Sequence, residues 1–359
     1  MRVAGIIKHL FRFIIITWLP VLLTMVNERR KKMKNKLRFM TFLVLALMLG
    51  FSGFSSAAEY PTKPIECLLP FGPGSVIAVS VKVVTDAASK LLGQPILMVS
   101  AGGAGGTIAG VRCASSKPDG YTLLATNSAT NGTALYTRKE IRYKNSDFEF
   151  LALYARQELG LIVKADAPFK SLEEFIAYGK ANNIKFAYQG VGTGQHICME
   201  LLKLRAGGLK IDYVPVISAF DLRTSVIGGH THASIIMGGG GGLGDEFRQA
   251  IEGGARILAV ASRERLKPYP DVPTYVEKGL DVVYRSWVGI AGPKGMPKEV
   301  SEKLKSVLYE VLKDPQVIQG IERLGYKFEF RKSDEFTKYV QEFEDLIKKV
   351  VEEAKISPI

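Results

Sequence analysis

Four apolar runs in this chain each end in a turn rich in glycine or hydroxyl residues. The turns are PFGPGS (70–75), SAGGAGGT (100–107), TNSATNGT (126–133) and GVGTGQH (190–196). Strand and helix patterns alternate along the chain, which predicts a mostly parallel sheet. In such a sheet the turns lie together at the carboxyl edge, where open α/β sheets bind ligands. Their free backbone N–H groups and the helices that follow favour an anionic ligand.

The spacing of apolar residues predicts the elements on both sides of these turns. Strands are expected at 65–71, 94–100, 121–127 and 184–189, and helices at 75–93, 107–117, 171–183, 196–207 and 299–314. The run 148–165 is long enough for two strands or for one strand that crosses between domains. Ser171 is the expected N-cap of its helix. A final helix from Ser333 has an apolar stripe that predicts core packing, formed by Phe336, Val340, Phe343, Ile347 and Val350.

Five consecutive glycines occupy positions 238–242. Each glycine loses more backbone freedom on folding than any other residue. The segment is therefore either a flexible loop or a place where the backbone must come close to another group.

The net charge of +13 would favour nucleic acid or an anionic membrane as a partner. Ten basic residues and one acidic residue lie in positions 1–58, however, so the remainder carries a net charge of only +4. The charge therefore belongs to a leader, and no nucleic-acid partner is expected.

The leader has the pattern of a secretory signal peptide that starts at Met33. A basic segment is followed by an apolar segment at 39–49 and by small residues at Ser56 and Ala58, which predicts cleavage before Glu59. No cysteine follows the apolar segment, so a lipoprotein anchor is not expected. The upstream apolar run at 13–26 is short for a membrane span, so translation is expected to begin at Met33, with an N-terminal anchor as the alternative.

The cysteines and histidines do not form a recognisable metal site. Cys67, Cys113 and Cys198 each lie in an apolar stretch and are expected to be buried thiols, with one disulfide and a free thiol as the alternative. His230 and His232 alternate like strand residues, but a pair of ligands falls short of a zinc site. No metal is expected.

The chain has no motif for catalysis, and its four turns do not match those for nucleotide binding. GVGTG does not match GxGxxG, and the chain contains no GxxxxGK[ST], GxSxG, HExxH or SxxK pattern. No cofactor and no enzymatic activity are expected. His196, which opens a helix after a glycine turn, is either a ligand contact or an ordinary first-turn residue.

Several motifs resemble, in order and spacing, the extracytoplasmic solute-binding proteins of tripartite tricarboxylate transporters, the Bug/TctC family. They are YPTKPIECLLPFGPG, GQPILMVSAGGAGGTIAG, KPDGYTLLATNS, YPDVPTYVEKG and SWVGIAGPKGMP. The similarity extends from Tyr60 to about Val351. The most specific motif is PDVPT followed by Glu277 and Gly279, with Ser262 and Arg265 upstream.

The resemblance implies an α/β fold of the periplasmic binding protein type II kind, with two α/β domains, a hinge and an interdomain cleft that closes on the ligand. Domain 1 is expected to comprise 59–158 and 285–359, and domain 2 to comprise 159–284, with crossings near 155–162 and 283–288. The resemblance also implies an organic carboxylate held largely by backbone N–H groups. The matching positions are Phe71, Gly72, Gly74, Ser75, Thr126, Asn127, Ser128, Gly192, Thr193, Gly194, His196, Ile217 and Ser218.

The chain departs from the family pattern where family members carry polar side chains. Ser75 and Ala78 replace a glycine and an aspartate, and Ala101 replaces an arginine. Val216 and Ile217 replace an aromatic residue and a lysine. Fewer polar side chains favour an aromatic or otherwise apolar monocarboxylate over citrate.

The expected function is that of a monomeric periplasmic receptor. It would capture a small carboxylate and deliver it to the permease subunits of a tripartite tricarboxylate transporter. A ligand-presenting component for a sensor kinase is the alternative, and the sequence does not separate the two.

Overall fold

The computed structural model describes residues 59–242 and 244–359, with a few isolated positions of the leader. Apart from those positions, the predicted signal peptide and the apolar run at 13–26 lie outside the described residues. Tyr60–Ile359 forms one compact unit, separate from Met1–Glu59. Within the described residues, no helix has both the length and the apolar character that a bilayer span needs.

Ten strands of the described chain join in one sheet, in the order β2-β1-β3-β9-β4-β7-β5-β6, with β8 and β10 paired to β4. The first domain contains β1 (Ile65–Leu69), β2 (Ile96–Ser100) and β3 (Thr122–Asn127), which are parallel, and the antiparallel β9 (Arg285–Pro293) and β10 (Lys327–Lys332). The second contains the parallel β5 (Ile184–Tyr188), β6 (Ile211–Pro215) and β7 (Ala233–Gly238), and β8 (Ala255–Val260), antiparallel to β4.

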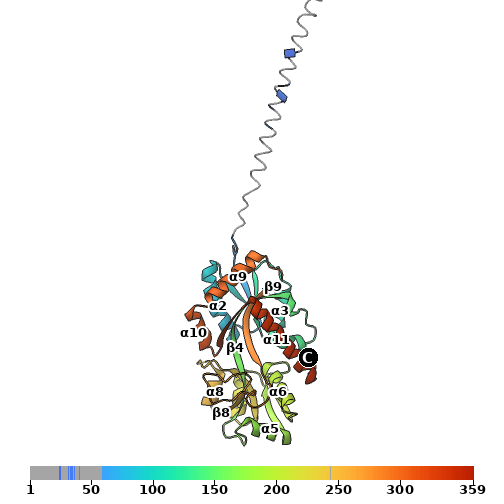
Figure 1. Ribbon diagram of the computed structural model, residues 1–359, viewed down its shortest axis with the longest axis vertical. Coiled ribbons are helices and arrows are strands. Elements are labelled where there is room, and N and C mark those ends of the chain that lie inside the picture. Colours follow the sequence, from blue (N-terminus) through green and yellow to red (C-terminus); the bar gives the residue numbers. More distant parts are fainter. Residues whose placement is uncertain are drawn as a thin grey trace, which may run out of the picture. The chain divides into compact units, whose positions relative to one another are not determined.

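The strand β4 (Phe148–Lys164) connects the two domains. Its residues 148–158 pair with β9, and residues 158–163 pair with β7. Figure 1 shows β4 running from the upper group of helices into the lower group. The long run at 148–165 is therefore one continuous strand, the second of the two predicted forms. The domain boundaries given above remain a prediction.

Helices cover the sheet in both domains (Figure 1). Around the first domain lie α2 (Val76–Leu92), α3 (Thr107–Ala114), α4 (Ala134–Thr137), α9 (Lys298–Val311), α10 (Pro315–Arg323) and α11 (Ser333–Glu353), with the short turns η2 (Ala104–Gly106), η3 (Ala129–Thr133) and η4 (Asn145–Asp147). Around the second lie α5 (Leu172–Ala181), α6 (Gly194–Arg205), α7 (Ala219–Ile227) and α8 (Glu246–Glu252).

The helix ends follow from local sequence. Ser75 caps α2, its Oγ accepting the Ala78 N–H at 3.2 Å, and Gly93 ends the helix at φ 68°, a conformation that favours glycine. Ser171 caps α5 as predicted, with its Oγ accepting the Glu174 N–H.

The predicted stripe on the final helix packs in the core. Phe336, Phe343 and the other three stripe residues are at most 6% exposed. Phe336 meets the ring of the buried Trp287 edge-on, with ring centroids 5.3 Å apart. Since Trp287 lies on β9, this contact fixes α11 against the strand beside β4.

The three cysteines are buried and unbridged. Burial raises the pKa of the Cys67 thiol to about 12 and raises those of the other two as well. Such thiols are inert because the reactive thiolate is disfavoured. In the described part of the chain, no group of three His, Cys, Asp or Glu side chains is placed to hold a metal ion.

Candidate ligand-binding cleft

A cleft of about 490 Å³ lies between the loops of the two domains. This volume is in the range of pockets for small organic molecules. Eight predicted site residues line the cleft, namely Phe71, Ser75, Asn127, Ser128, Gly192, Thr193, Gly194 and Ile217. These residues come from three of the four glycine- or hydroxyl-rich turns and from Ile217. The fourth turn, 100–107, also reaches the cleft through Gly105.

The other five predicted residues lie beside the cleft or behind its wall. Gly72 and Gly74 are exposed in the first turn. The buried Thr126 donates its hydroxyl to Asn131 at 2.7 Å. Ser218 caps α7, its Oγ accepting the Asp221 N–H. Ligand contact by these residues remains a prediction.

His196, the fifth of these residues, packs behind the Gly192 loop. Its Nδ1 accepts the Gly192 N–H at 3.4 Å, and its ring contacts Tyr188 and Tyr213. Burial lowers the pKa of His196, an effect that Glu200 partly opposes. The neutral ring therefore supports the glycine loop.

Ala78, where relatives are expected to carry an acid, is 1% exposed and packs in the core of the first domain. It does not line the cleft, whereas its neighbours Val76 and Ile77 do. The first loop thus offers the cleft apolar side chains and the Ser75 cap.

Among the described residues, two charged side chains line the cleft, and the sequence motifs indicated neither. The Arg138 guanidinium lies beside Gly105, where a β-carbon would be 3.4 Å from its Nε. It makes no hydrogen bond or ion pair with any residue that the structure describes. A cation that is partly buried and unpaired provides a site for a carboxylate.

Glu246, at the start of α8, is the other charged residue of the cleft wall. Arg223 of α7 lies beside it, with 3.6 Å between the Arg223 Nη1 and the Glu246 Oε2. Burial raises the pKa of the Glu246 carboxyl to about 7, although Arg223 opposes the shift. The group therefore changes charge near neutral pH.

The glycine run at 238–242 crosses to the first domain instead of forming an open loop. β-Carbons on Gly240 and Gly242 would collide with the carbonyl oxygens of Tyr326 and Glu322. The Gly244 N–H donates to the Arg323 carbonyl at 3.1 Å. The second predicted form, a close approach of backbone, is the one that the structure contains.

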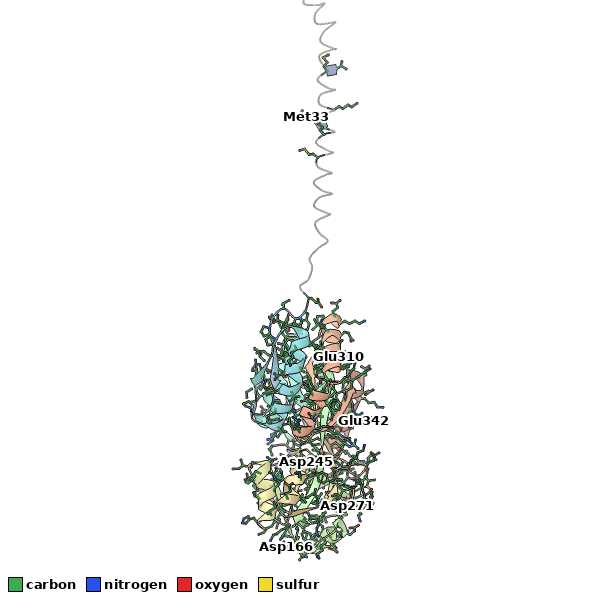
Figure 2. All side chains as sticks on the ribbon, turned by 90° about the vertical axis from the view of Figure 1, so that its left-hand side faces the viewer. Met33, Asp166, Asp245, Asp271, Glu310 and Glu342 are labelled. Atoms are coloured by element: carbon green, nitrogen blue, oxygen red, sulfur yellow. The ribbon has the colours of Figure 1, made fainter. Side chains whose placement is uncertain are left out.

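Asp245 holds this glycine segment in place. Its buried carboxylate accepts the N–H groups of Gly239, Gly241 and Phe247, and the Tyr269 hydroxyl donates to it at 2.9 Å. Figure 2 shows Asp245 at the level where the upper and lower parts of the molecule meet. An acid three residues after a glycine run is the sequence signal that could have identified it.

Opposite the glycine run, Gly192 approaches the first domain. A β-carbon on Gly192 would collide with Thr137 of α4. The two domains thus touch beside α4 and beside α10, and α11 also meets α6, where Arg205 pairs with Glu353 at 3.4 Å. Residues of both contact regions line the cleft, Thr137 and Gly192 beside α4 and Leu324 and Tyr326 beside α10.

A buried ionic cluster lies where the chain crosses between domains. Glu158 of β4 is 1% exposed, and its carboxylate lies 3.3 Å from the Arg156 Nε and 3.7 Å from the Arg285 Nε. Arg156 also contacts Glu329 of β10 at 2.9 Å. Burial raises the pKa of Glu158, and the two arginines oppose that shift. The cluster ties β4, β9 and β10 together at the crossing.

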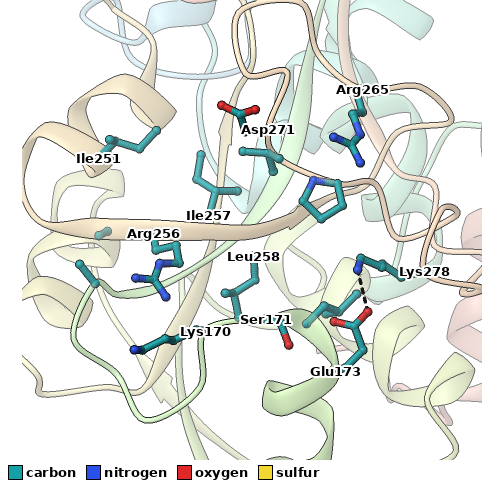
Figure 3. Close-up of a pocket in the computed structure, with 15 residues that line it drawn as sticks. Lys170, Ser171, Glu173, Ile251, Arg256, Ile257, Leu258, Arg265, Asp271 and Lys278 are labelled. Atoms are coloured by element: carbon teal, nitrogen blue, oxygen red, sulfur yellow. Dashed lines mark ion pairs between the residues drawn. The ribbon is translucent and has the colours of Figure 1, made fainter.

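A second hollow, of about 620 Å³, lies between α5, β8 and the segment 265–278 (Figure 3). Its Lys278 pairs with Glu173 at 2.8 Å. All its lining residues lie between 165 and 278, and none is a predicted site residue. The cleft between the domains is therefore the better candidate site.

Comparison with known families agrees with this architecture. The family model described as tripartite tricarboxylate transporter family receptor matches residues 80–356. The chain belongs to this family. Members of the family are periplasmic solute-binding proteins. This chain has the same fold, with two α/β domains.

Individual relatives span nearly the same length. BugT of Bordetella pertussis is 29% identical over 290 residues, which cover 79% of this chain and 87% of BugT. A solved structure of a periplasmic transporter is 29% identical, with a TM-score of 0.70 and coverage of 83% of this chain and 99% of that one. MatC of Rhodopseudomonas palustris, solved with bound malate, is 25% identical, with a TM-score of 0.68 and coverage of 81% and 100%.

Proposed function

We propose that this protein captures a small organic carboxylate in the periplasm and delivers it to the membrane subunits of a tripartite tricarboxylate-type transporter. The proposal rests on the Arg138 guanidinium, a cation in a cleft between two domains that has no partner among the described residues. Glycine turns and the hydroxyls of Ser128 and Ser286 surround the same space. The family relationship, with malate bound to the similar MatC, supports a carboxylate as ligand.

The chain acts as a receptor and not as an enzyme. In the part of the chain that the structure describes, the cysteines lie outside the cleft and His196 lies behind its wall, which supports a receptor over an enzyme. The leader directs export, with cleavage before Glu59.

Mass spectrometry of small molecules released from the purified protein tests the ligand class. We expect a carboxylic acid to be released. The protein is then unfolded and refolded without ligand, and calorimetry should show that it binds this acid. Release of a neutral sugar, or the absence of binding by any carboxylate, would contradict the proposal.

Delivery to a transporter is tested in the source cells. Deletion of the gene should abolish uptake of the acid that mass spectrometry identifies, and a plasmid copy should restore it. Normal uptake in the deletion strain would mean that the protein does not serve transport of that acid.

A further inference from the structure

The ligand cleft has opposite charges at its two ends. Among the lining residues that the structure describes, Arg138 and Glu246 alone carry charge. Arg138 follows α4, whose Thr137 accepts the backbone N–H of the C-terminal Ile359 at 3.1 Å. Glu246 begins α8, and Figure 1 shows α8 and the C-terminus on opposite sides of the molecule.

The surroundings of the two groups support this separation. Gly105, Thr137 and Gly192 border the cleft near Arg138, whereas Met237, Leu324 and Tyr326 belong to the end near Glu246. The wall also carries the apolar side chains of Val76, Ile77 and Ile217. A bound molecule therefore meets a cation at one end, an acid at the other and apolar surface along its length.

Arg223 does not neutralise Glu246 fully. The separation of 3.6 Å exceeds the 2.7–2.9 Å that is typical of a charge-assisted hydrogen bond. Asp245 adds a further negative charge next to Glu246. A ligand carboxylate at this end would be repelled, while a hydroxyl, N–H or ammonium group would find an acceptor.

On the basis of the proposed function, we propose that the cleft selects a monocarboxylate that has a hydrogen-bond donor at its far end. Arg138 binds the carboxylate and Glu246 accepts from the donor. Glu246 is thus a specificity-determining residue that excludes dicarboxylates. The preference for a donor and the exclusion of dicarboxylates are both differences in affinity between related acids.

Calorimetry with two matched series of acids tests this selection. One series is pentanoate, 5-aminopentanoate and glutarate, and the other is benzoate, 4-hydroxybenzoate and terephthalate. We expect the acid with a donor to bind about tenfold more tightly than the dicarboxylate of its series. In the Glu246→Gln variant the dicarboxylate should gain about tenfold in affinity, and 5-aminopentanoate should lose affinity.

Glu252→Gln is the matched control, because Glu252 is an exposed acid on the same helix. It should leave every affinity unchanged. The selection is overturned if the dicarboxylates bind most tightly to the wild-type protein, or if Glu246→Gln changes the affinities no more than Glu252→Gln. Those outcomes leave a carboxylate receptor intact, whereas failure of all six acids to bind, together with release of a non-acidic ligand, would overturn the proposed function as well.

Discussion

Gly240 lies so close to Tyr326 that any β-carbon at position 240 would collide with the Tyr326 carbonyl oxygen. Gly242 stands in the same relation to Glu322, and the Gly244 N–H donates to Arg323 at 3.1 Å. The glycine run therefore brings backbone of the second domain against backbone of the first. Side chains would hold the two domains apart at this contact.

Gly240→Ala should weaken ligand binding, because closure of the domains would have to displace the Tyr326 backbone. Overpacking of this kind costs about 1–3 kcal/mol, and about 1.4 kcal/mol corresponds to a tenfold loss of affinity. Small-angle scattering should show a larger radius for the variant than for the wild type at saturating ligand. Gly208→Ala is the control, since nothing lies within 4 Å of a β-carbon there and Gly208 does not line the cleft. Equal affinity of Gly240→Ala and wild type would disprove the importance of this contact.

Arg138→Gln should weaken carboxylate binding by about tenfold to a hundredfold, the range for loss of a hydrogen bond to a charged group. Lysine at position 138 should restore part of the affinity through charge alone. Calorimetry with the copurified acid measures both. The exposed Arg142 provides a control, and Arg142→Gln should bind as the wild type does. A comparable loss in the Arg142 variant would point to a general electrostatic effect instead.

Glu246→Gln should change how stability depends on pH. The pKa of Glu246 is about 7 in the folded protein against an ordinary value of 4.5, because burial and, less strongly, Asp245 disfavour the charged form. The folded state therefore holds the proton longer, and the wild type loses stability as pH rises from 4.5 to 7.

The Gln variant lacks this loss, so its free energy of unfolding relative to the wild type should rise by about 3 kcal/mol between pH 4.5 and pH 8. Urea denaturation at both pH values measures the difference. Arg223 loses its partner at either pH, and that effect cancels in the comparison. A constant difference across the pH range would show that Glu246 does not titrate there.

His196→Asn should reduce the sensitivity of the fold to acid. Burial lowers the pKa of His196 below its ordinary value of 6.5, so the unfolded chain takes up a proton first as pH falls. The wild type therefore loses stability as pH falls below 6.5. Asparagine keeps an acceptor for the Gly192 N–H without a charge change. Thermal unfolding from pH 7 to 5 measures this effect, and the exposed His230 supplies the control substitution His230→Asn. Parallel curves for wild type and His196→Asn would contradict it.

Local patterns predicted most of the secondary structure. The caps Ser75 and Ser171 and the stripe on α11 lie where the sequence placed them, because capping and helical periodicity involve only near neighbours in the chain. For the run at 148–165 the sequence allows two strands or one strand that crosses between domains, and pairing with β9 and β7 decides between them. Strand pairing joins residues far apart in sequence, which apolar runs alone do not reveal.

The cleft was predicted from its turns but not from its charges. Asn127 lies in a motif that resembles the family, and Gly192 and Gly194 lie in a glycine-rich turn after a strand, so their position at the cleft followed from the sequence. Arg138 and Glu246 lie in no motif, and each resembles an ordinary surface residue until the domains meet. Ala78 is the opposite case. The sequence pointed to it because relatives carry an aspartate there, but its side chain is buried in the core.

The amino-acid sequence by itself determined the family, the alternation of strands and helices, and the turns that can present backbone N–H groups to an anion. These properties depend on short segments, each of which carries its own signal. Only the tertiary structure decided that the glycine run is a contact between domains and that an unpaired cation and a buried acid lie in one cleft. Their distances and burial arise from segments that meet through folding. Burial matters because a charge acts more strongly on a ligand where water is excluded.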